Sequence, residues 1–195
     1  MKTFLLAFIP LLVAIDPFGT LPLFVGLTEG YDQKEKKHLA LQAVTTAFIV
    51  GVLFGAAGHY VFNLLGITGA DFRIAGGLLL LIFSIGEVFG RTEKDTNGGT
   101  RDAFLGVVPL GIPLVAGPAT ITTLLILHDS YPFLIVVAAL AANLALSYLT
   151  FFYSDRIIHT VGEATSKVTA KIVAIFLAAI GIMMIRKGLE AILVR

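Results

Sequence analysis

Apolar segments long enough to cross a membrane recur along the whole chain. About 20 consecutive, mainly apolar residues cross the hydrocarbon core of a bilayer as an α-helix. Such segments occupy approximately residues 3–28, 39–65, 71–90, 103–127, 132–153 and 169–190. None shows the alternating pattern of a membrane β-barrel. The sequence therefore predicts an all-α membrane protein with six transmembrane helices in a single transmembrane domain, residues 1–195.

The composition supports this fold class and excludes several functions. Hydrophobic residues make up 57% of the chain and charged residues 14%, and the mean hydropathy of +0.93 lies above that of soluble domains. With a net charge of +1 and no dense basic stretch, nucleic acid is not an expected partner. The absence of cysteine excludes disulfides and thiolate chemistry. No catalytic or nucleotide-binding motif is present, so we expect neither an enzyme nor a cofactor.

Two of the apolar segments contain helix breakers near their midpoints. In IDPFGTLPLF, residues 15–24, two prolines remove backbone N–H donors and Gly19 allows the chain to unwind. We predict two half-helices there, at about 3–14 and 20–28. The stretch PLGIPLVAGPATIT, residues 109–122, predicts a second break near 116–119.

The two breaks also indicate an internal repeat. Asp16-Pro17 corresponds to Gly117-Pro118 about 100 residues later, and each half has a broken span, an intact span and a third span before a charged segment or the end of the chain. Because each half would cross the membrane three times, the halves would have inverted topologies, as in many secondary transporters. We predict repeat 1 at approximately 1–90, a charged loop at 91–102 and repeat 2 at approximately 103–195.

Irregular backbone at membrane depth survives where it is buried in protein or lines a cavity. A half-helix that begins there offers N–H groups to a carboxylate, and one that ends there offers carbonyls to an ammonium group or a cation. An amino acid zwitterion carries both charges. The predicted substrate site comprises Asp16, Pro17, Phe18, Gly19, Thr20, Ala116, Gly117, Pro118, Ala119, Thr120, Thr122 and Asn143. For the threonines, capping of their own helices is an equal alternative.

Asp16 allows several interpretations. An aspartate at the centre of a membrane helix costs about 2.5 to 3.5 kcal/mol, which calls for a partner or a function. It could bind a substrate ammonium, ligate a coupling sodium ion, carry a coupling proton or cap the second half-helix. A metal site is thus unknown from sequence, with Asp16 as a ligand if the protein is sodium-coupled.

Small residues predict close helix contacts elsewhere. Gly51, Gly55 and Gly58 share one face of the second span, and Gly76-Gly77 would admit another backbone to the third span. Ser147, one turn after Asn143, is expected to hydrogen-bond within the helix bundle.

The basic residues predict the orientation in the membrane. Nine of them would lie on one face of the membrane: Lys34, Lys36, Lys37, Arg91, Lys94, Arg101, Arg156, Lys167 and Lys171. The other five would lie on the opposite face: Lys2, Arg73, Arg186, Lys187 and Arg195. The positive-inside rule then makes the first face cytoplasmic. We expect a multi-pass protein of the plasma (inner) membrane with both termini outside.

Three segments together resemble the MarC family of six-span inner-membrane proteins: IDPFGTLPLF, FRIAGGLLLLIFSI and PLGIPLVAGPATIT. The resemblance covers essentially the whole chain. Members have been described as small neutral amino acid transporters, the SnatA group, so the resemblance implies ion-coupled movement of glycine, alanine or similar amino acids. The family's motifs correspond here to Asp16, Pro17, Gly19 and Pro22, and to Gly117, Pro118, Ala119 and Thr120. Asparagine often stands in the family where this chain has Asp16, so the coupling ion need not be shared.

The functional hypothesis is a secondary transporter of small neutral amino acids in which two inverted repeats rock around a site at the breaks. The alternative is a passive channel or facilitator for small solutes. An intramembrane enzyme would require a nucleophile-base or metal constellation that the sequence does not provide, and a scaffold would leave two buried breaks unexplained. The expected partners are the amino acid and the lipid bilayer; the sequence determines neither the oligomeric state nor the coupling ion.

Overall fold

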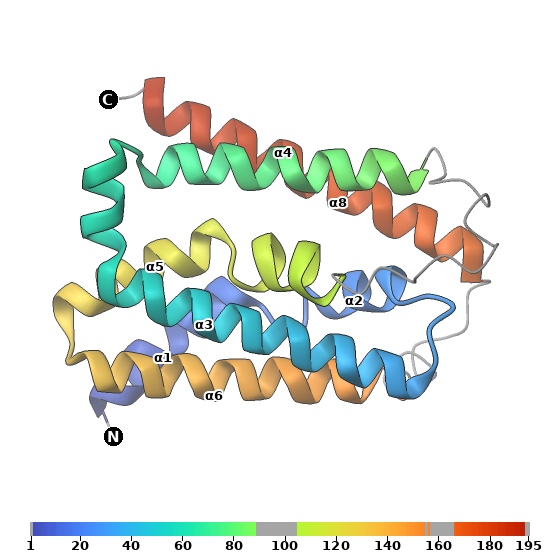
Figure 1. The fold of residues 1–195 in the computed structure, drawn as a ribbon, viewed down its shortest axis with the longest axis horizontal. Coiled ribbons are helices and arrows are strands. Elements are labelled where there is room, and N and C mark those ends of the chain that lie inside the picture. The colour runs from blue at the N-terminus through green and yellow to red at the C-terminus, as the bar shows by residue number, and fades with distance from the viewer. Residues whose placement is uncertain (1, 89–104, 155, 157–165, 194–195) are drawn as a thin grey trace.

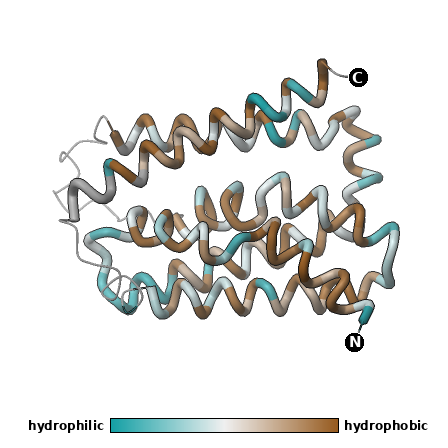
Figure 2. Tube along the Cα trace, turned by 180° about the vertical axis from the view of Figure 1, so that it is seen from behind, coloured by the Kyte–Doolittle hydropathy of each residue, from teal (hydrophilic) through white to brown (hydrophobic). Residues whose placement is uncertain are grey.

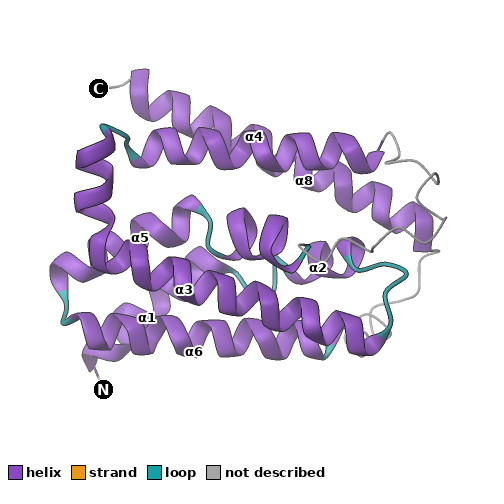
Figure 3. Cartoon of the chain, viewed as in Figure 1, coloured by secondary structure: helices purple, strands orange, loops and turns teal. Residues whose placement is uncertain are grey.

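The computed structural model describes residues 2–88, 105–154, 156 and 166–193, and these residues form helices joined by short connections (Figures 1 and 3). No β-strand occurs in the described residues. The all-α prediction is therefore confirmed. The predicted charged loop at 91–102 lies outside the described residues.

The described elements are α1 (Lys2–Ile15), α2 (Leu21–Leu27), α3 (Gln33–Leu65), α4 (Gly69–Val88), η2 (Gly106–Val115), α5 (Pro118–Ser130), α6 (Phe133–Phe152) and α8 (Ser166–Leu193). The predicted first and fourth spans each correspond to two elements, α1 with α2 and η2 with α5. α3 begins earlier than expected because Asp32 and Glu35 form a capping box. The Asp32 carboxylate accepts the Glu35 N–H at 2.7 Å, and the Glu35 carboxylate accepts the Asp32 N–H at 2.8 Å.

Several helices suit a membrane. Among the described residues, three helical stretches are long and apolar enough to cross one: Gln33–Leu65, Gly69–Gly86 and Phe133–Phe152. The pair η2 and α5, bent by 56°, is a fourth candidate. The count of six crossings and the inverted topology stay predictions.

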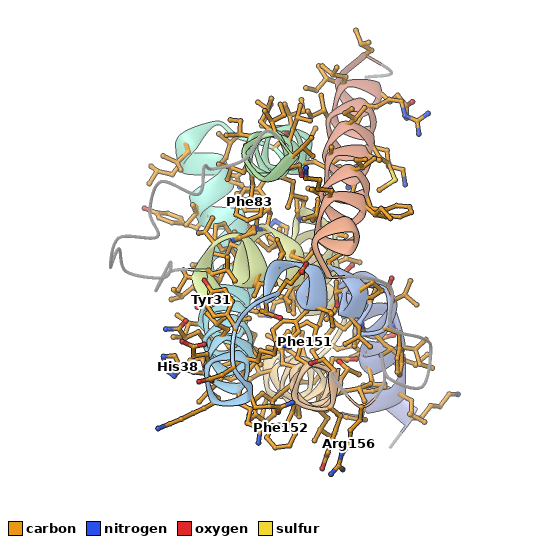
Figure 4. The ribbon with its side chains drawn as sticks, turned by 90° about the vertical axis from the view of Figure 1, so that its right-hand side faces the viewer. Tyr31, His38, Phe83, Phe151, Phe152 and Arg156 are labelled. Carbon is orange, nitrogen blue, oxygen red and sulfur yellow. The ribbon has the colours of Figure 1, made fainter. Side chains whose placement is uncertain are left out.

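The ribbon has three layers (Figures 1 and 4). α1, α3 and α6 lie together on one side, α4 and α8 lie on the opposite side, and α2, η2 and α5 lie between them. Successive passes along the long axis run in opposite directions, and the first and last described residues lie toward the same end (Figure 1). The broken elements therefore occupy the middle layer.

Glycines set the closest contacts between helices. A Cβ at Gly77 of α4 would lie 2.5 Å from the carbonyl oxygen of Gly181 in α8, and a Cβ at Gly181 would lie 2.6 Å from the carbonyl oxygen of Gly77. The two backbones thus touch, as the sequence predicts for the Gly76-Gly77 pair. In α3, a Cβ at Gly51 would meet Leu140 of α6 at 2.8 Å. A Cβ at Gly58 would meet Leu125 of α5 at 2.7 Å, so the small-residue face of α3 is also confirmed as a contact face.

The outer surface is apolar. Val13 and Leu134 are 74% and 79% exposed, and many other large hydrophobic side chains of α1, α3, α4, α6 and α8 are also exposed. Along the backbone, hydrophobic residues dominate the helices and hydrophilic ones are concentrated toward the two ends (Figure 2). Such a surface suits lipid rather than water.

Candidate functional site

The first break lies between α1 and α2, at residues 16–20, where the sequence predicts it. Asp16 has φ 46°, a left-handed conformation in which aspartate and asparagine are enriched among non-glycine residues. Its exposed side chain reaches forward over the break, where Oδ1 accepts the Gly19 N–H at 3.0 Å. The carboxylate therefore caps a backbone N–H donor in the turn just before α2 begins.

Gly19 and Thr20 complete this turn. A Cβ at Gly19 would overlap the Asp16 carboxylate, so only glycine leaves room for the capping arrangement. The buried Thr20 hydroxyl donates to the Asp16 carbonyl oxygen at 2.9 Å and lies 3.3 Å from the Pro17 carbonyl oxygen. Pro17 is buried, whereas Phe18 is 63% exposed. The predicted site residues of the first break thus divide between the interior and the surface.

The second break lies at Ala116 and Gly117, between η2 and α5. Gly117 is the N-cap of α5, with extended backbone angles and no side-chain cap, and Pro118 follows in the first turn. η2 is itself irregular, with non-helical angles at Val108 and Ile112, each next to a proline. The first N–H groups of α5 therefore have no side-chain acceptor, unlike that of Gly19 in the first break.

The two breaks approach each other through Thr120. Its hydroxyl donates to the Val115 carbonyl oxygen at 2.9 Å and lies 3.5 Å from the Ala14 carbonyl oxygen in the last turn of α1. The C-terminal end of α1 therefore adjoins the N-terminal end of α5. A negative and a positive helix end meet at one place.

The other predicted residues of α5 lie differently. The Thr122 hydroxyl donates to the Pro118 carbonyl oxygen at 2.8 Å, within its own helix, and its methyl group faces Gly69 at the start of α4. Ala119 is exposed. For Thr122 the geometry favours the capping alternative.

Asn143 lies in the core between α6 and α1. It is completely buried, and its Nδ2 donates to the carbonyl oxygens of Phe8 at 3.1 Å and Ala139 at 2.9 Å. Its Oδ1 has no hydrogen-bond partner. A buried acceptor without a partner costs about 1 to 3 kcal/mol, so a hydrogen bond donated to the Asn143 Oδ1 would be stabilising.

A polar stripe on α6 continues from Asn143 to the first break. The buried Ser147 hydroxyl donates to the Asn143 carbonyl oxygen of its own helix at 3.1 Å, where the sequence predicts a bond between helices. The Thr150 hydroxyl donates to Ser147 at 2.8 Å and lies 3.4 Å from the Pro17 carbonyl oxygen. Thr150 was not among the predicted site residues. Asn143, Ser147 and Thr150 follow one another at spacings of four and then three residues. This helical pattern would have indicated that the three share one face of α6.

In the part of the chain that the structure describes, no group of three or more His, Cys, Asp or Glu side chains could hold a metal ion. Any cation at the breaks would depend on Asp16 together with backbone carbonyls.

These features define an α-helical integral membrane protein built around two broken helices. The chain belongs to the MarC family, since the sequence model described as "MarC family integral membrane protein" matches residues 1–193. It is 29% identical to a UPF0056 membrane protein of Methanocaldococcus jannaschii, covering 99% of this chain and 98% of that protein. It is 31% identical to the UPF0056 membrane protein YvbG of Bacillus subtilis, covering 94% of this chain and 92% of that protein. A UPF0056 membrane protein of Archaeoglobus fulgidus is also 31% identical, with 98% and 94% covered. No solved structure gives a significant match.

Proposed function

We propose that the protein is a secondary transporter of small neutral amino acids of the glycine and alanine class. The observation that carries the proposal is the meeting of two helix ends of opposite polarity, where the Thr120 hydroxyl lies 3.5 Å from the Ala14 carbonyl oxygen. The C-terminal end of α1 attracts cations, and the N-terminal end of α5 attracts anions. An α-amino acid presents both charges one carbon apart.

The two ends have distinct roles in this proposal. The substrate carboxylate accepts hydrogen bonds from the first turn of α5, which has no side-chain cap at Gly117. The ammonium group faces the last carbonyls of α1 and the carboxylate of Asp16. Asn143 adds an unpartnered Oδ1 as a hydrogen-bond acceptor in the core between α6 and α1. Because Ala14 and Val115, the residues whose carbonyl oxygens lie beside the Thr120 hydroxyl, have small or aliphatic side chains, a short apolar side chain suits the site best.

Asp16 is the proposed coupling residue. Only one of its carboxylate oxygens is used by the Gly19 N–H, so the second can take a proton or ligate sodium. No cofactor is needed, and the proposal assigns no enzymatic activity. The protein would reside in the plasma (inner) membrane with both termini outside, as the distribution of basic residues favours.

Uptake into proteoliposomes tests the proposal. Labelled glycine or alanine is offered with and without proton and sodium gradients, and accumulation above equilibrium is expected with one of them. Asp16→Asn should abolish accumulation while the protein remains folded, because the amide keeps the capping oxygen and loses the charge. Asp129→Asn, an exposed carboxylate at the far end of α5, is the matched control and should transport normally. Failure to bind or move either amino acid would reject the substrate class.

A passive facilitator is the second candidate, favoured by the hydrogen bond between Gly19 and Asp16. If that bond is the whole role of the carboxylate, the site lacks a coupling group. Uptake would then stop at equilibrium under every gradient, and Asp16→Asn would transport like the wild type.

A further inference from the structure

The helices divide into two packed bodies that do not coincide with the two halves of the sequence. α4 and α8 make the most extensive contact of any two described elements. Along it, Gly77 and Gly181 bring the backbones together, and a Cβ at Gly188 would lie 2.9 Å from the Ala70 carbonyl oxygen. Backbone-to-backbone packing over this length leaves little freedom for one helix to move against the other. We call this pair, α4 with α8, the arm.

The second body is built on α3 and α6. These two helices pack on each other, α1 packs on α6, and η2 packs on α3. Asn143 fastens α6 to α1 through the Phe8 carbonyl oxygen, and a Cβ at Gly51 would meet Leu140 across the α3 and α6 contact. We call α1, α3 and α6 the bundle. Like the arm, it combines helices from both halves of the sequence, α1 and α3 from the first and α6 from the second.

Both breaks lie between the arm and the bundle. The principal contacts of the arm with the rest of the described chain are made to α2, η2 and α5, the broken elements of the middle layer (Figures 1 and 4). α2 is held from both sides, because it packs on α8 and its Phe24 ring stacks on Phe151 of α6 at 4.5 Å. Gly76 of the arm faces the second break, where a Cβ would lie 3.4 Å from side-chain atoms of Pro113 and of Pro118.

One end of the arm is attached to the bundle. The last turns of α3 rise from the bundle layer to the layer of the arm (Figure 1). There the Phe72 ring of α4 lies 5.7 Å from Phe54 and 6.2 Å from Phe62, both of α3. Ile121 and Leu125 of α5 complete this cluster. The arm is thus pinned at one end by aromatic contacts, and it meets the breaks along its length.

We infer that the arm moves as one rigid body against the bundle, pivoting at the aromatic cluster, and that this motion opens the breaks alternately to the two sides. The inference rests on the proposed transport function but differs from a rocking of the two sequence repeats. In a repeat-wise motion, α3 and α4 would stay together while α4 and α8 separated. The contact of Gly77 with Gly181 opposes that separation.

Four labelling positions distinguish the two motions. The chain contains no cysteine, so a spin label will react only with the pairs of cysteines that are introduced. Exposed positions exist on each helix: Ile49 on α3 at 53%, Ile82 on α4 at 66%, Leu149 on α6 at 50% and Ile175 on α8 at 61%. Distance distributions are measured by pulsed electron paramagnetic resonance in liposomes, with and without alanine and at two pH values.

The expected result is a fixed distance for the two pairs within a body, Ile82→Cys with Ile175→Cys and Ile49→Cys with Leu149→Cys. The two pairs across the bodies, Ile49→Cys with Ile82→Cys and Leu149→Cys with Ile175→Cys, should each show two populations or a shift. The reverse pattern would establish repeat-wise motion and overturn the inference, as would fixed distances or variable distances in all four pairs.

Uptake, measured separately on the same proteoliposomes, keeps the two proposals distinguishable. Cross-body motion without uptake would reject the transport function and leave the two-body division standing. Uptake with repeat-wise motion would reject the division alone.

Discussion

At the scale of single residues, Asp16 combines a structural and a chemical property in one side chain. Its left-handed backbone, φ 46°, and its bond to the Gly19 N–H at 3.0 Å both suit an aspartate or an asparagine. The capping role therefore does not require the charge. The proposed function assigns the charge to a substrate or an ion. Stability measurements report on the capping role of Asp16, and transport measurements report on the role of its charge.

The first prediction compares two substitutions of Asp16. Asp16→Asn should leave the free energy of unfolding within a few tenths of a kcal/mol, since asparagine keeps the acceptor and the favoured conformation. Asp16→Ala should lose about 1 kcal/mol from the cap and about 1 to 2 kcal/mol from the left-handed backbone. Reversible unfolding in detergent, followed by circular dichroism, measures both. Equal losses for the two variants would show that the cap does not stabilise the break.

Gly19 provides a second prediction, on coupling between neighbours. Gly19→Ala should destabilise the wild type because the new Cβ overlaps the Asp16 carboxylate. In the Asp16→Ala background the carboxylate is gone, so the same substitution should cost less. A double-mutant cycle should yield a coupling of about 1 kcal/mol. Additive losses would mean that the carboxylate does not lie over Gly19.

At the scale of elements, helix breakers and glycines have separate consequences. The prolines and Gly19 place the first break where the sequence predicts it, and Gly117 with Pro118 places the second. Between α4 and α8 the glycines act differently, because they remove side chains from a contact between backbones. The carbonyl oxygens of Gly77 and Gly181 occupy the space that side chains would need.

The third prediction tests that contact with a matched pair in α4. Gly77→Ala should destabilise the protein by about 1 to 3 kcal/mol, the usual cost of overpacking. Gly86→Ala, in the same helix with no atom within 4 Å of the added Cβ, should stay within about 1 kcal/mol of the wild type. The unfolding assay used for Asp16 compares them. Similar effects at both positions would contradict a close approach of α8 to Gly77.

At the scale of the whole molecule, the passes alternate in direction and the first and last described residues share one end (Figure 1). The opposite end carries the beginning of α3, with Lys34 and Lys37. The positive-inside rule predicts that this end is cytoplasmic, so both termini are expected to face outward.

The fourth prediction follows from this orientation. Single cysteines at Lys2 and Leu193, both exposed, should react with a membrane-impermeant maleimide added to intact cells. A cysteine at the exposed Lys34 should react only after the membrane is permeabilised. The opposite pattern would reverse the orientation without moving the site, and reaction of all three in intact cells would contradict the arrangement of passes.

The sequence by itself determined the helical class, the membrane setting and the position of both breaks. These properties are local: a run of apolar residues must be helical in lipid, and proline or glycine interrupts a helix wherever it stands. The positions of the polar residues Asp16 and Asn143 inside apolar spans were likewise evident from the sequence. Placing a polar side chain there costs free energy, which indicates a partner or a function for it.

The tertiary structure decided which helix ends meet and which helices pack together. The approach of Thr120 to Ala14 and the bond of Asn143 to Phe8 join residues more than 100 positions apart. No local pattern encodes such a pairing, because it depends on how whole helices pack. Gly76-Gly77 of the third span predict close approach to some backbone, but packing alone selected Gly181 of the sixth span as the partner. The arm that spans both halves of the sequence follows from that pairing.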